Sequence, residues 1–440
     1  MAEHTFHSVR LDTEKCKGCT HCIRHCPTQA IRVRDGKAQI RAERCIDCGV
    51  CIRVCPHHAK LAARDSMNRL LEFEYRVALP APALYGQFSK LDDIDYVLTA
   101  LKMLGFDDCF EVSRGAELIS DATRLLMQEG KLQKPVISSA CPAVCRLIQV
   151  AFPKLIPHLL PLVPPMEAAA RLARAEAVEK TGLAPEKIGV FFLTPCPAKI
   201  TDIRQPQNLA KSNVDGAIAI KDIYTVLLQE MNRMENPEPL SQSGIIGVSW
   251  ASSGGESAAL LRDQYLAADG IENVIKVLEE MEDEKLRRLE FAELNACTGG
   301  CVGGCLTAEN PYVAKARIAM LRKYLPVARN HLPTQESVPP EMRWELPLAP
   351  SNAMKLADNI GDAMTMMHMI NELMERLPGL DCGTCGAPGC RALAEDVVRG
   401  LVREEDCVFR RREGMDKTEM REHIPAPFRT AEDAGETQEP

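Results

Sequence analysis

The sequence predicts a multidomain α/β protein with a small cysteine-rich segment towards each end. From about residue 76 to 325, apolar runs of strand length alternate with helix-like stretches, as in largely parallel sheets flanked by helices. These runs read EYRVALPAPAL, PVISSA, KIGVFFLT, GAIAI, GIIGVSW and RLEFAELNA. The chain has 440 residues, of which 46% are apolar, so we expect two to four domains with cores of their own.

The N-terminal segment, residues 1–62, carries one cysteine pattern twice. Each copy reads C-x2-C-x2-C-x3-C-P. In two-cluster bacterial ferredoxins, this spacing lets three close thiolates bind one 4Fe-4S cluster while the fourth cysteine reaches the other cluster. We therefore expect a two-cluster ferredoxin-like domain, with zinc as the less favoured alternative. The first cluster would bind Cys16, Cys19, Cys22 and Cys55, and the second would bind Cys45, Cys48, Cys51 and Cys26.

Three predicted strands of the large domain, residues 76–330, are each followed by a cysteine. Cys141 follows VISSA, Cys196 follows VFFLTP and Cys297 follows FAELNA. Because ligand sites gather at the carboxyl ends of strands in open α/β sheets, we expect these loops to meet. Cys301 comes four residues after Cys297 in ACTGGC, where glycines let the backbone approach an inorganic centre. The four thiolates predict a further 4Fe-4S cluster, with buried structural cysteines as the alternative.

The C-terminal part begins with a proline-rich stretch, residues 331–352, which predicts a linker. A methionine-rich helix is expected over 353–378, with an apolar stripe that packs in a core or forms the seam of a homodimer. Residues 379–410 contain the pattern C-x2-C-x4-C-x16-C and resemble the small 4Fe-4S domain of corrinoid and electron-transport complex subunits. The charged tail, 411–440, is expected to be disordered. The pattern predicts one more 4Fe-4S cluster, with zinc as the alternative, on Cys382, Cys385, Cys390 and Cys407.

Charge and hydropathy indicate which partners and which cellular environment the protein is suited to. The net charge is −8, yet residues 1–60 hold 11 Lys and Arg against 6 Asp and Glu. This local surplus either compensates the negative clusters or meets an acidic docking partner. Aromatic residues interleaved with basic ones are absent, which argues against nucleic acid. The most apolar run, LIPHLLPLVPPM, is broken by prolines, so no membrane span is expected. With 19 cysteines and no signal-peptide pattern, we expect reduced thiols in the cytoplasm.

From about residue 11 to 325, the chain resembles the iron-iron hydrogenase family. Three signature loops match SSACP at 138–142, TPCPAK at 194–199 and ELNACTGGC at 293–301, and SSGGESAALLR at 252–262 matches a glycine-rich segment. The resemblance implies the hydrogenase fold and an H-cluster, a 4Fe-4S cube joined to a two-iron subsite that carries CO, cyanide and a dithiolate. It also implies maturation factors that supply this group. With the clusters described above, the chain would hold four 4Fe-4S clusters.

The resemblance also implies a role for individual residues. The cube would be held by Cys141, Cys196, Cys297 and Cys301, with Cys301 as the bridge to the two-iron subsite. Lys199 falls on the lysine that makes a charge-assisted hydrogen bond to a cyanide. The glycines expected beside the cofactor are Gly254, Gly255 and Gly300.

The chain departs from members of the family with fast turnover at the positions that carry protons. The cysteine that relays protons is replaced by Ala140, which cannot carry one. Two glutamates further back are replaced by Asp121 and Arg124, and a guanidinium cannot act as a carboxylate relay. Methionines near the subsite are replaced by Thr194 and Asn295, so we expect a more polar pocket.

Three more cysteines have no assigned cluster. Cys145 and Cys305, the latter in place of a family glycine, are expected to pack structurally, with a substitute proton relay as the alternative. Cys109 is expected in the core.

These departures resemble the sensory hydrogenases, slow members of the family with alanine at the relay position. The resemblance implies reversible H2 = 2 H+ + 2 e− at low turnover, with electrons passed to a redox protein such as ferredoxin or to a signalling partner. One alternative is a working ferredoxin-linked hydrogenase. Another is an iron-sulfur assembly or electron-transfer scaffold that lacks the two-iron subsite.

Overall fold

The computed structural model describes residues 6–334 and 336–413. The chain divides into two compact units, Met1–Asp12 with Ala42–Met354 and Thr13–Arg41 with Lys355–Pro440. The segment predicted as one ferredoxin-like domain, residues 1–62, is therefore shared between the two units. The disorder predicted for 411–440 falls outside the described residues, except that 411–413 end helix α15 (Val408–Glu413).

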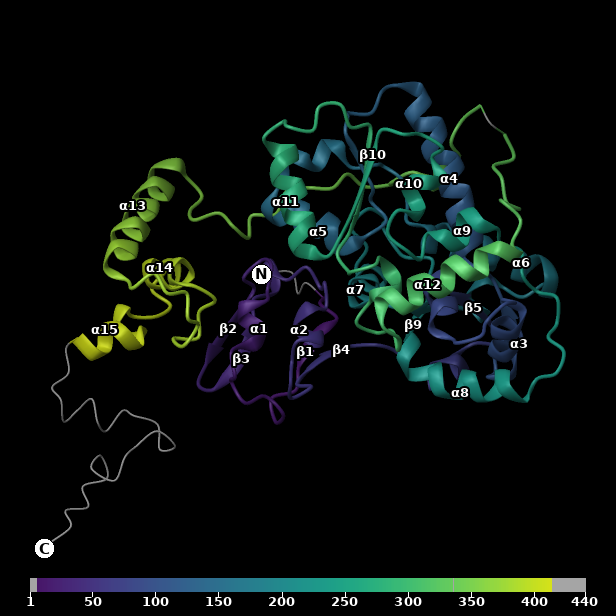
Figure 1. The fold of residues 1–440 in the computed structure, drawn as a ribbon, viewed down its shortest axis with the longest axis horizontal. Coiled ribbons are helices and arrows are strands. Elements are labelled where there is room, and N and C mark those ends of the chain that lie inside the picture. The colour runs from purple at the N-terminus through teal and green to yellow at the C-terminus, as the bar shows by residue number, and fades with distance from the viewer. Residues whose placement is uncertain (1–5, 335, 414–440) are drawn as a thin grey trace, which may run out of the picture. The chain divides into compact units, whose positions relative to one another are not determined.

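The larger sheet of the first unit has four parallel strands in the order β6-β5-β8-β9. Its strands are β5 (Tyr75–Pro80), β6 (Asp108–Cys109), β8 (Ile188–Thr194) and β9 (Gly216–Ala219). All residues of β8 are buried. The strand is almost entirely apolar, as expected for a parallel strand that is covered on both faces. The sheet packs against α3 (Asp95–Met103), α6 (Pro165–Thr181), α7 (Pro197–Arg204) and α8 (Ile220–Arg233), and α3 and α8 also contact each other (Figure 1).

The smaller sheet of the first unit has three parallel strands in the order β10-β11-β7. The strands are β7 (Val136–Ile137), β10 (Tyr265–Asp269) and β11 (Phe291–Asn295). Figure 1 shows β10 between α11 (Ile271–Glu282) and α10 (Gly255–Ala259), both of which contact it. Helix α5 (Pro142–Ala151) follows β7, and the largely buried α4 (Val112–Glu129) packs against α6 and α9 (Ile245–Ser249). Helix α12 (Pro311–Leu321) completes the unit.

The prediction of parallel α/β sheets is confirmed, but one apolar run was misassigned. GIIGVSW is not a strand, because its residues 245–249 form helix α9. A short apolar run cannot be assigned to strand or buried helix by periodicity alone. Gly247 lets α9 approach α4 closely, since a Cβ there would lie 2.1 Å from the Ser113 carbonyl oxygen. Strand β10, which is partly exposed, was not expected from the sequence.

The N-terminal residues of the first unit are held by one buried carboxylate. Strand β1 (Val9–Leu11) pairs antiparallel with β4 (Lys60–Ala62), and α2 (Val50–Arg53) lies between them in sequence. Asp47 accepts hydrogen bonds from the Val9 amide at 3.0 Å and from Arg146 of α5 at 3.1 Å. Ser8 donates from Oγ to the Pro197 carbonyl oxygen at 2.6 Å. The second cysteine loop is thereby fixed to the helices that follow Cys141 and Cys196.

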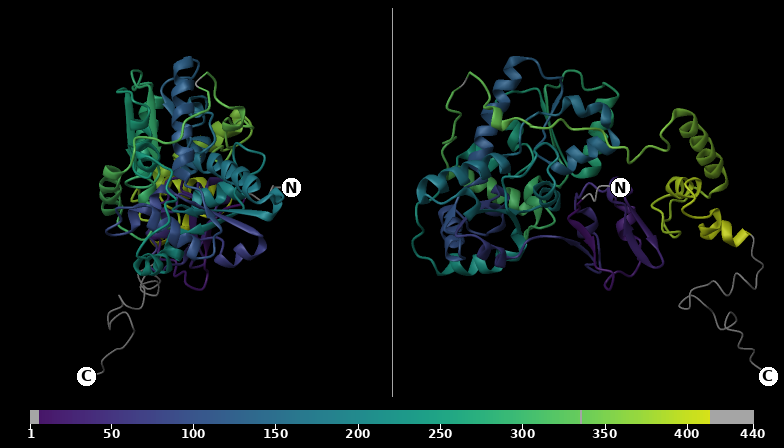
Figure 2. Two further views of the ribbon diagram at one scale, coloured as in Figure 1. Left: turned by 90° about the vertical axis from the view of Figure 1, so that its right-hand side faces the viewer. Right: turned by 180° about the vertical axis from the view of Figure 1, so that it is seen from behind.

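The second unit combines the first ferredoxin-like repeat with the C-terminal part of the chain. The repeat contributes α1 (His21–Arg24) and the hairpin of β2 (Ile31–Arg34) and β3 (Lys37–Ile40). The C-terminal part contributes α13 (Ile360–Arg376) and α14 (Cys390–Val398), which lie side by side in Figures 1 and 2.

Helix α13 is shorter than the predicted segment 353–378, because Asn359 caps it by accepting a hydrogen bond from the Asp362 amide. The apolar stripe is divided along its length. Ile370 and Leu373 are buried against α14, whereas Ile360 and Met364 are exposed. Among the described residues, no helix is both long and apolar enough to cross a bilayer.

Candidate functional site

Three strand-to-helix turns present the cysteines predicted for the large domain. Cys141 and Cys196 are the residues just before α5 and α7, and each is followed by a proline at the first helical position. Proline is suited to that position, because its missing N–H would have no partner within the helix. Cys297 lies two residues after the end of β11 at Asn295, and Cys301 begins a short 3-10 helix, Cys301–Gly303. The cysteines therefore come from the carboxyl ends of β7, β8 and β11.

The four thiols are close enough to influence one another electrostatically. Cys196 interacts with Cys141, Cys297 interacts with both, and Cys301 interacts with Cys141. Burial raises the pKa of Cys196 and Cys297 well above the ordinary thiol value, and it raises the pKa of Cys301 to about 11. Without metal these three thiols are protonated at neutral pH, so metal binding must release protons. Four soft donors that meet from three turns suit an iron-sulfur cube.

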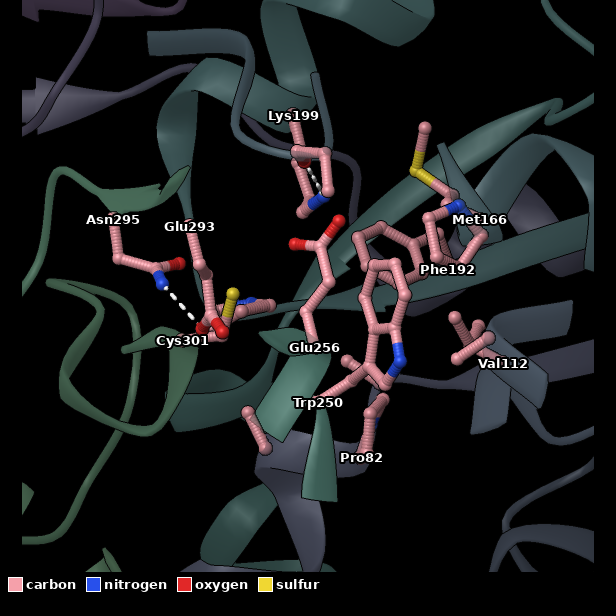
Figure 3. A pocket seen from close by; sticks show the side chains of 16 residues that line it. Pro82, Val112, Met166, Phe192, Lys199, Trp250, Glu256, Glu293, Asn295 and Cys301 are labelled. Atoms are coloured by element: carbon pink, nitrogen blue, oxygen red, sulfur yellow. Dashed lines mark hydrogen bonds between the residues drawn. The ribbon is translucent and has the colours of Figure 1, made fainter. Parts of the chain in front are cut away.

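A cavity of about 590 Å³, including its solvent-open part, lies beside Cys301. Figure 3 shows its apolar wall, formed by Pro82, Val112, Met166, Phe192 and Trp250. Its polar lining consists of Cys301, Lys199, Glu256, Glu293 and Asn295. The space next to the predicted bridging cysteine is therefore not filled by side chains.

Lys199 brings a buried positive charge to the cavity. Its Nζ donates a hydrogen bond to the Ala140 carbonyl oxygen at 3.1 Å. Burial alone would lower the pKa of Lys199, but the negative charge that the sulfurs of Cys301, Cys196 and Cys141 carry when deprotonated outweighs burial and raises it. The ammonium is therefore charged and suited to an anionic ligand. Ala140 also lines the cavity, where its methyl group cannot carry a proton.

Two buried glutamates in the cavity were not identified from the sequence as functional. Glu256 on α10 accepts a hydrogen bond from Ser138 Oγ at 2.7 Å. In Figure 3 its carboxylate points towards Lys199. Burial and the nearby carboxylate of Glu293 raise the pKa of Glu256 to about 8. A group with this pKa both accepts and releases a proton near neutral pH.

Glu293 on β11 is the second of these carboxyl groups. It accepts hydrogen bonds at 2.9 Å from the amides of Gly254 and Ser257 and from Asn295 Nδ2. Burial raises its pKa despite these hydrogen bonds. Glu256 lies inside the signature segment SSGGESAALLR and Glu293 inside ELNACTGGC. Their positions in these segments were the only feature of the sequence that could have marked them as functional. Their burial was not visible in the sequence.

Three glycines expected beside the cofactor shape the surrounding loops. A Cβ at Gly255 would lie 1.9 Å from the Ser249 carbonyl oxygen, and Gly300 is at φ +89°. Gly254 is at φ +90°, and its amide donates to Glu293. Among the described residues that line the cavity, none is one of these glycines.

The polar residues expected at the family's relay and methionine positions form local interactions. Arg124 pairs with Asp121 and donates to the Ala259 carbonyl oxygen. Thr194 donates to the Cys196 carbonyl oxygen at 3.0 Å and accepts from the Cys196 amide at 3.1 Å. Of the polar residues Asp121, Arg124, Thr194 and Asn295, only Asn295 is among the described residues that line the cavity, so the expected gain in polarity comes from that residue.

The unassigned cysteines lie outside the cavity lining. Cys145 donates to the Ser139 carbonyl oxygen at 3.4 Å, and Cys109 donates to the Leu98 carbonyl oxygen at 3.4 Å. Cys305 packs against Gly49, where a Cβ would lie 2.4 Å from its Sγ. These contacts favour a structural role for all three.

The cysteines of the N-terminal repeats are distributed over both units. Cys45, Cys48, Cys51 and Cys55 lie in the first unit, and Cys16, Cys19, Cys22 and Cys26 lie in the second. Backbone amides donate hydrogen bonds to sulfurs in both repeats. Ala30 donates to Cys26 at 3.2 Å, Ala59 to Cys55 at 3.3 Å and Ala38 to Cys16 at 3.4 Å. Such N–H···S contacts stabilise cluster thiolates.

The C-terminal cysteines lie together in the second unit. Cys390 begins α14, and its amide donates to Asp381 at 2.6 Å. Electrostatic interactions link Cys385 to Cys382 and to Cys407. The buried pair, Cys390 and Cys407, belongs to the same apolar cluster.

Comparisons with known proteins match three parts of the chain, each of which contains predicted cluster cysteines. The family described as "Iron only hydrogenase large subunit, C-terminal domain" matches residues 74–267. A "4Fe-4S dicluster domain" matches residues 8–56, and a "Putative Fe-S cluster" family matches residues 377–409.

Two curated relatives and one solved structure are similar to the chain. The periplasmic Fe hydrogenase large subunit of Nitratidesulfovibrio vulgaris is 27% identical over 60% of this chain and 69% of its own length. Iron hydrogenase 1 of Clostridium pasteurianum is 22% identical over 68% of this chain and 64% of its own length. The FeFe-hydrogenase HydA1 of Chlamydomonas reinhardtii superposes with a TM-score of 0.47 at 16% identity, covering 60% of this chain and 90% of its own.

Proposed function

We propose, since residues 74–267 match the family described as the iron-only hydrogenase large subunit, that this chain catalyses the reversible reaction H2 = 2 H+ + 2 e− at low turnover. The observation that carries the proposal is the cavity beside Cys301, which is lined by one buried ammonium and two buried carboxyl groups. A scaffold that only stores or transfers electrons needs no such space. The chain therefore suits a hydrogenase better than an assembly factor.

The donor set fits the cofactor that the family implies. The thiols of Cys141, Cys196, Cys297 and Cys301 would hold the cube, and Cys301 faces the cavity in which the two-iron group would lie. The Lys199 ammonium would bind one of its cyanide ligands by a charge-assisted hydrogen bond. When bound, the two-iron group supplies the site for heterolytic splitting of H2. The apolar wall of Phe192, Met166 and Trp250 limits the access of water to that site.

Protons would move through the two glutamates, since Ala140 cannot relay them. Glu256 faces the cavity and its pKa lies near neutrality. Glu293 interacts electrostatically with Glu256 and is hydrogen-bonded to the half-exposed Asn295. We infer that a proton passes from the cavity to Glu256 and then to Glu293. It reaches solvent near Asn295, at the end of β11.

Low turnover suits a sensor of hydrogen or of redox state. Losing the thiol relay raises a kinetic barrier but leaves the equilibrium between H2, protons and electrons unchanged. A barrier increase of about 4 kcal/mol slows a step roughly a thousandfold. The accessory clusters would pass the electrons to a redox or signalling partner.

Infrared spectroscopy of the anaerobically matured protein tests the proposal. Metal-bound CO and cyanide stretches are expected, and their absence from protein with a full complement of 4Fe-4S clusters would leave only the scaffold. Turnover with a redox dye then separates the slow enzyme from a working ferredoxin-linked hydrogenase, because only the latter gives a fast rate.

A further inference from the structure

In the second unit, one buried carboxylate joins the C-terminal domain to the first ferredoxin-like repeat. Asp396 of α14 is fully buried, with 0% of its side chain exposed. It accepts hydrogen bonds from Arg32 Nε at 2.6 Å, Arg34 Nη2 at 3.0 Å and Arg41 Nη2 at 2.9 Å. These arginines lie on or directly after the β2–β3 hairpin. Removing one partner from a buried ion pair leaves an uncompensated charge, so this junction is sensitive to the loss of Asp396.

Further contacts at the same junction reach the cysteine loops themselves. Arg24, the last residue of the helix that carries Cys22, donates to the Cys382 carbonyl oxygen. Arg34 Nη1 donates to the Cys385 carbonyl oxygen at 3.1 Å. Two arginines of the first repeat therefore hold the first two cysteines of the C-terminal pattern.

The two loops also meet through their backbones. The Val33 amide donates to the Gly386 carbonyl oxygen at 2.8 Å. Gly386 is at φ +79°, and a Cβ there would lie only 1.9 Å from the Val33 carbonyl oxygen. Only glycine permits this approach, which brings the C-terminal cysteine loop onto the hairpin of the first repeat.

We propose that Asp396 is a positioning residue that holds the cluster of Cys382, Cys385, Cys390 and Cys407 beside the cluster bound through Cys16, Cys19 and Cys22, so that the two exchange electrons directly. The inference rests on the cluster ligands assumed in the proposed function. In the exchange, one electron leaves the reduced C-terminal cluster, which is oxidised by one unit, and the first ferredoxin-like cluster is reduced by one unit. No other reductant is needed within the pair.

The charge of the junction stabilises the reduced state of both clusters. Three guanidinium groups face one carboxylate, which leaves a net charge of +2 among these four side chains. Each cluster gains one negative charge on reduction, and positive charge nearby stabilises that state. Part of the excess of basic residues in segment 1–60 therefore pairs with Asp396 of the C-terminal domain, within the same chain.

Electron paramagnetic resonance of the fully reconstituted chain, reduced anaerobically with dithionite, tests the inference. The wild type is expected to show magnetic interaction between the two reduced clusters, and Asp396→Asn is expected to weaken it. The exchange of the Val33 amide with solvent deuterium should become about tenfold faster in that variant, because the junction opens more often. Glu404→Gln is the matched control, since Glu404 pairs with Arg376 and Arg410 of the C-terminal part only.

Arg41→Gln provides a milder variant that keeps the pairs of Asp396 with Arg32 and Arg34. It should shift both measurements in the same direction by a smaller amount. Unchanged spectra and exchange in both Asp396→Asn and Arg41→Gln would overturn the inference. So would loss of four irons per chain in Asp396→Asn with an unaltered Arg41→Gln, because Asp396 would then act only in folding. If the infrared bands of CO and cyanide were missing, only the proposed function would be refuted. The present inference would stand, because the resonance and exchange measurements depend only on the 4Fe-4S clusters.

Discussion

The Nζ atom of Lys199 lies 3.1 Å from the carbonyl oxygen of Ala140, which fixes a buried ammonium on the cavity wall beside Cys301. The backbone of Ala140 therefore orients the lysine, while its side chain contributes only a methyl group. Side-chain changes at Ala140 can be made without removing this hydrogen bond.

Substituting Ala140→Cys should raise hydrogen turnover by about tenfold or more, because a thiol restores a proton-transfer group at the cavity. Dye-linked assays on protein with a full complement of iron and of CO and cyanide bands would measure the rate. Ala140→Val is the control that adds bulk without a proton. An equal or lower rate in the cysteine variant would show that position 140 is not the bottleneck.

Replacing Lys199→Met should weaken retention of the two-iron group about 10- to 100-fold, since a hydrogen bond to a charged group contributes roughly 1.5–3 kcal/mol. The infrared bands should fade while the visible absorption of the 4Fe-4S clusters persists. Lys199→Arg, which keeps the charge, should retain more of the group than the methionine variant does. Full band intensity in Lys199→Met would contradict the assigned contact.

Glu256→Gln and Glu293→Gln should each lower turnover by about a hundredfold, because neither amide can pass a proton. The infrared spectrum of both variants should stay close to that of the wild type. The pH dependence of the rate near pH 8 should disappear in Glu256→Gln. A wild-type rate in both variants would place the proton route elsewhere.

The free energy of unfolding of the metal-free protein should depend on pH through the titration of Glu256. Its folded pKa of about 8 lies above the ordinary value of 4.5, so the folded state binds more protons than the unfolded state between these pH values. This contribution to stability is present below about pH 4.5 and is lost as the pH rises towards 8, by up to about 1.4 kcal/mol per pH unit.

Thermal unfolding at pH 5, 6.5 and 8 measures that signature. Glu256→Gln should flatten the fall in stability over this range. Glu290→Gln is the control, because pairing with Lys134 and Arg262 lowers the pKa of Glu290, and its contribution changes only at acidic pH. A slope in Glu256→Gln as steep as that of the wild type would contradict a protonated Glu256 in the fold.

Spacing along the chain was sufficient to find the cysteines and the strands that precede Cys141, Cys196 and Cys297, since these are local patterns. The turns at Cys141 and Cys196 were expected and are present. The role of Glu256 and Glu293 was not predictable, because a glutamate in a signature segment carries no sign of its burial. The contact of Asp396 with Arg32 joins residues 364 positions apart, so no window of sequence contains it.

Segment 245–249 shows a different limit of the sequence. Its apolar run suits a strand as well as it suits a helix, and the outcome depends on Gly247, whose lack of a side chain admits α4. Tertiary packing decided the local structure there.

The hydrogen bond from Ser8 to Pro197 has a consequence for biosynthesis, because its partners are 189 positions apart. The first strand leaves the ribosome long before the turn that secures it has been made. Iron loading of the loop at residues 45–55 should therefore be completed only after synthesis has passed α7, and a bulky fusion ahead of Ser8 should impair it more than one attached at the other terminus.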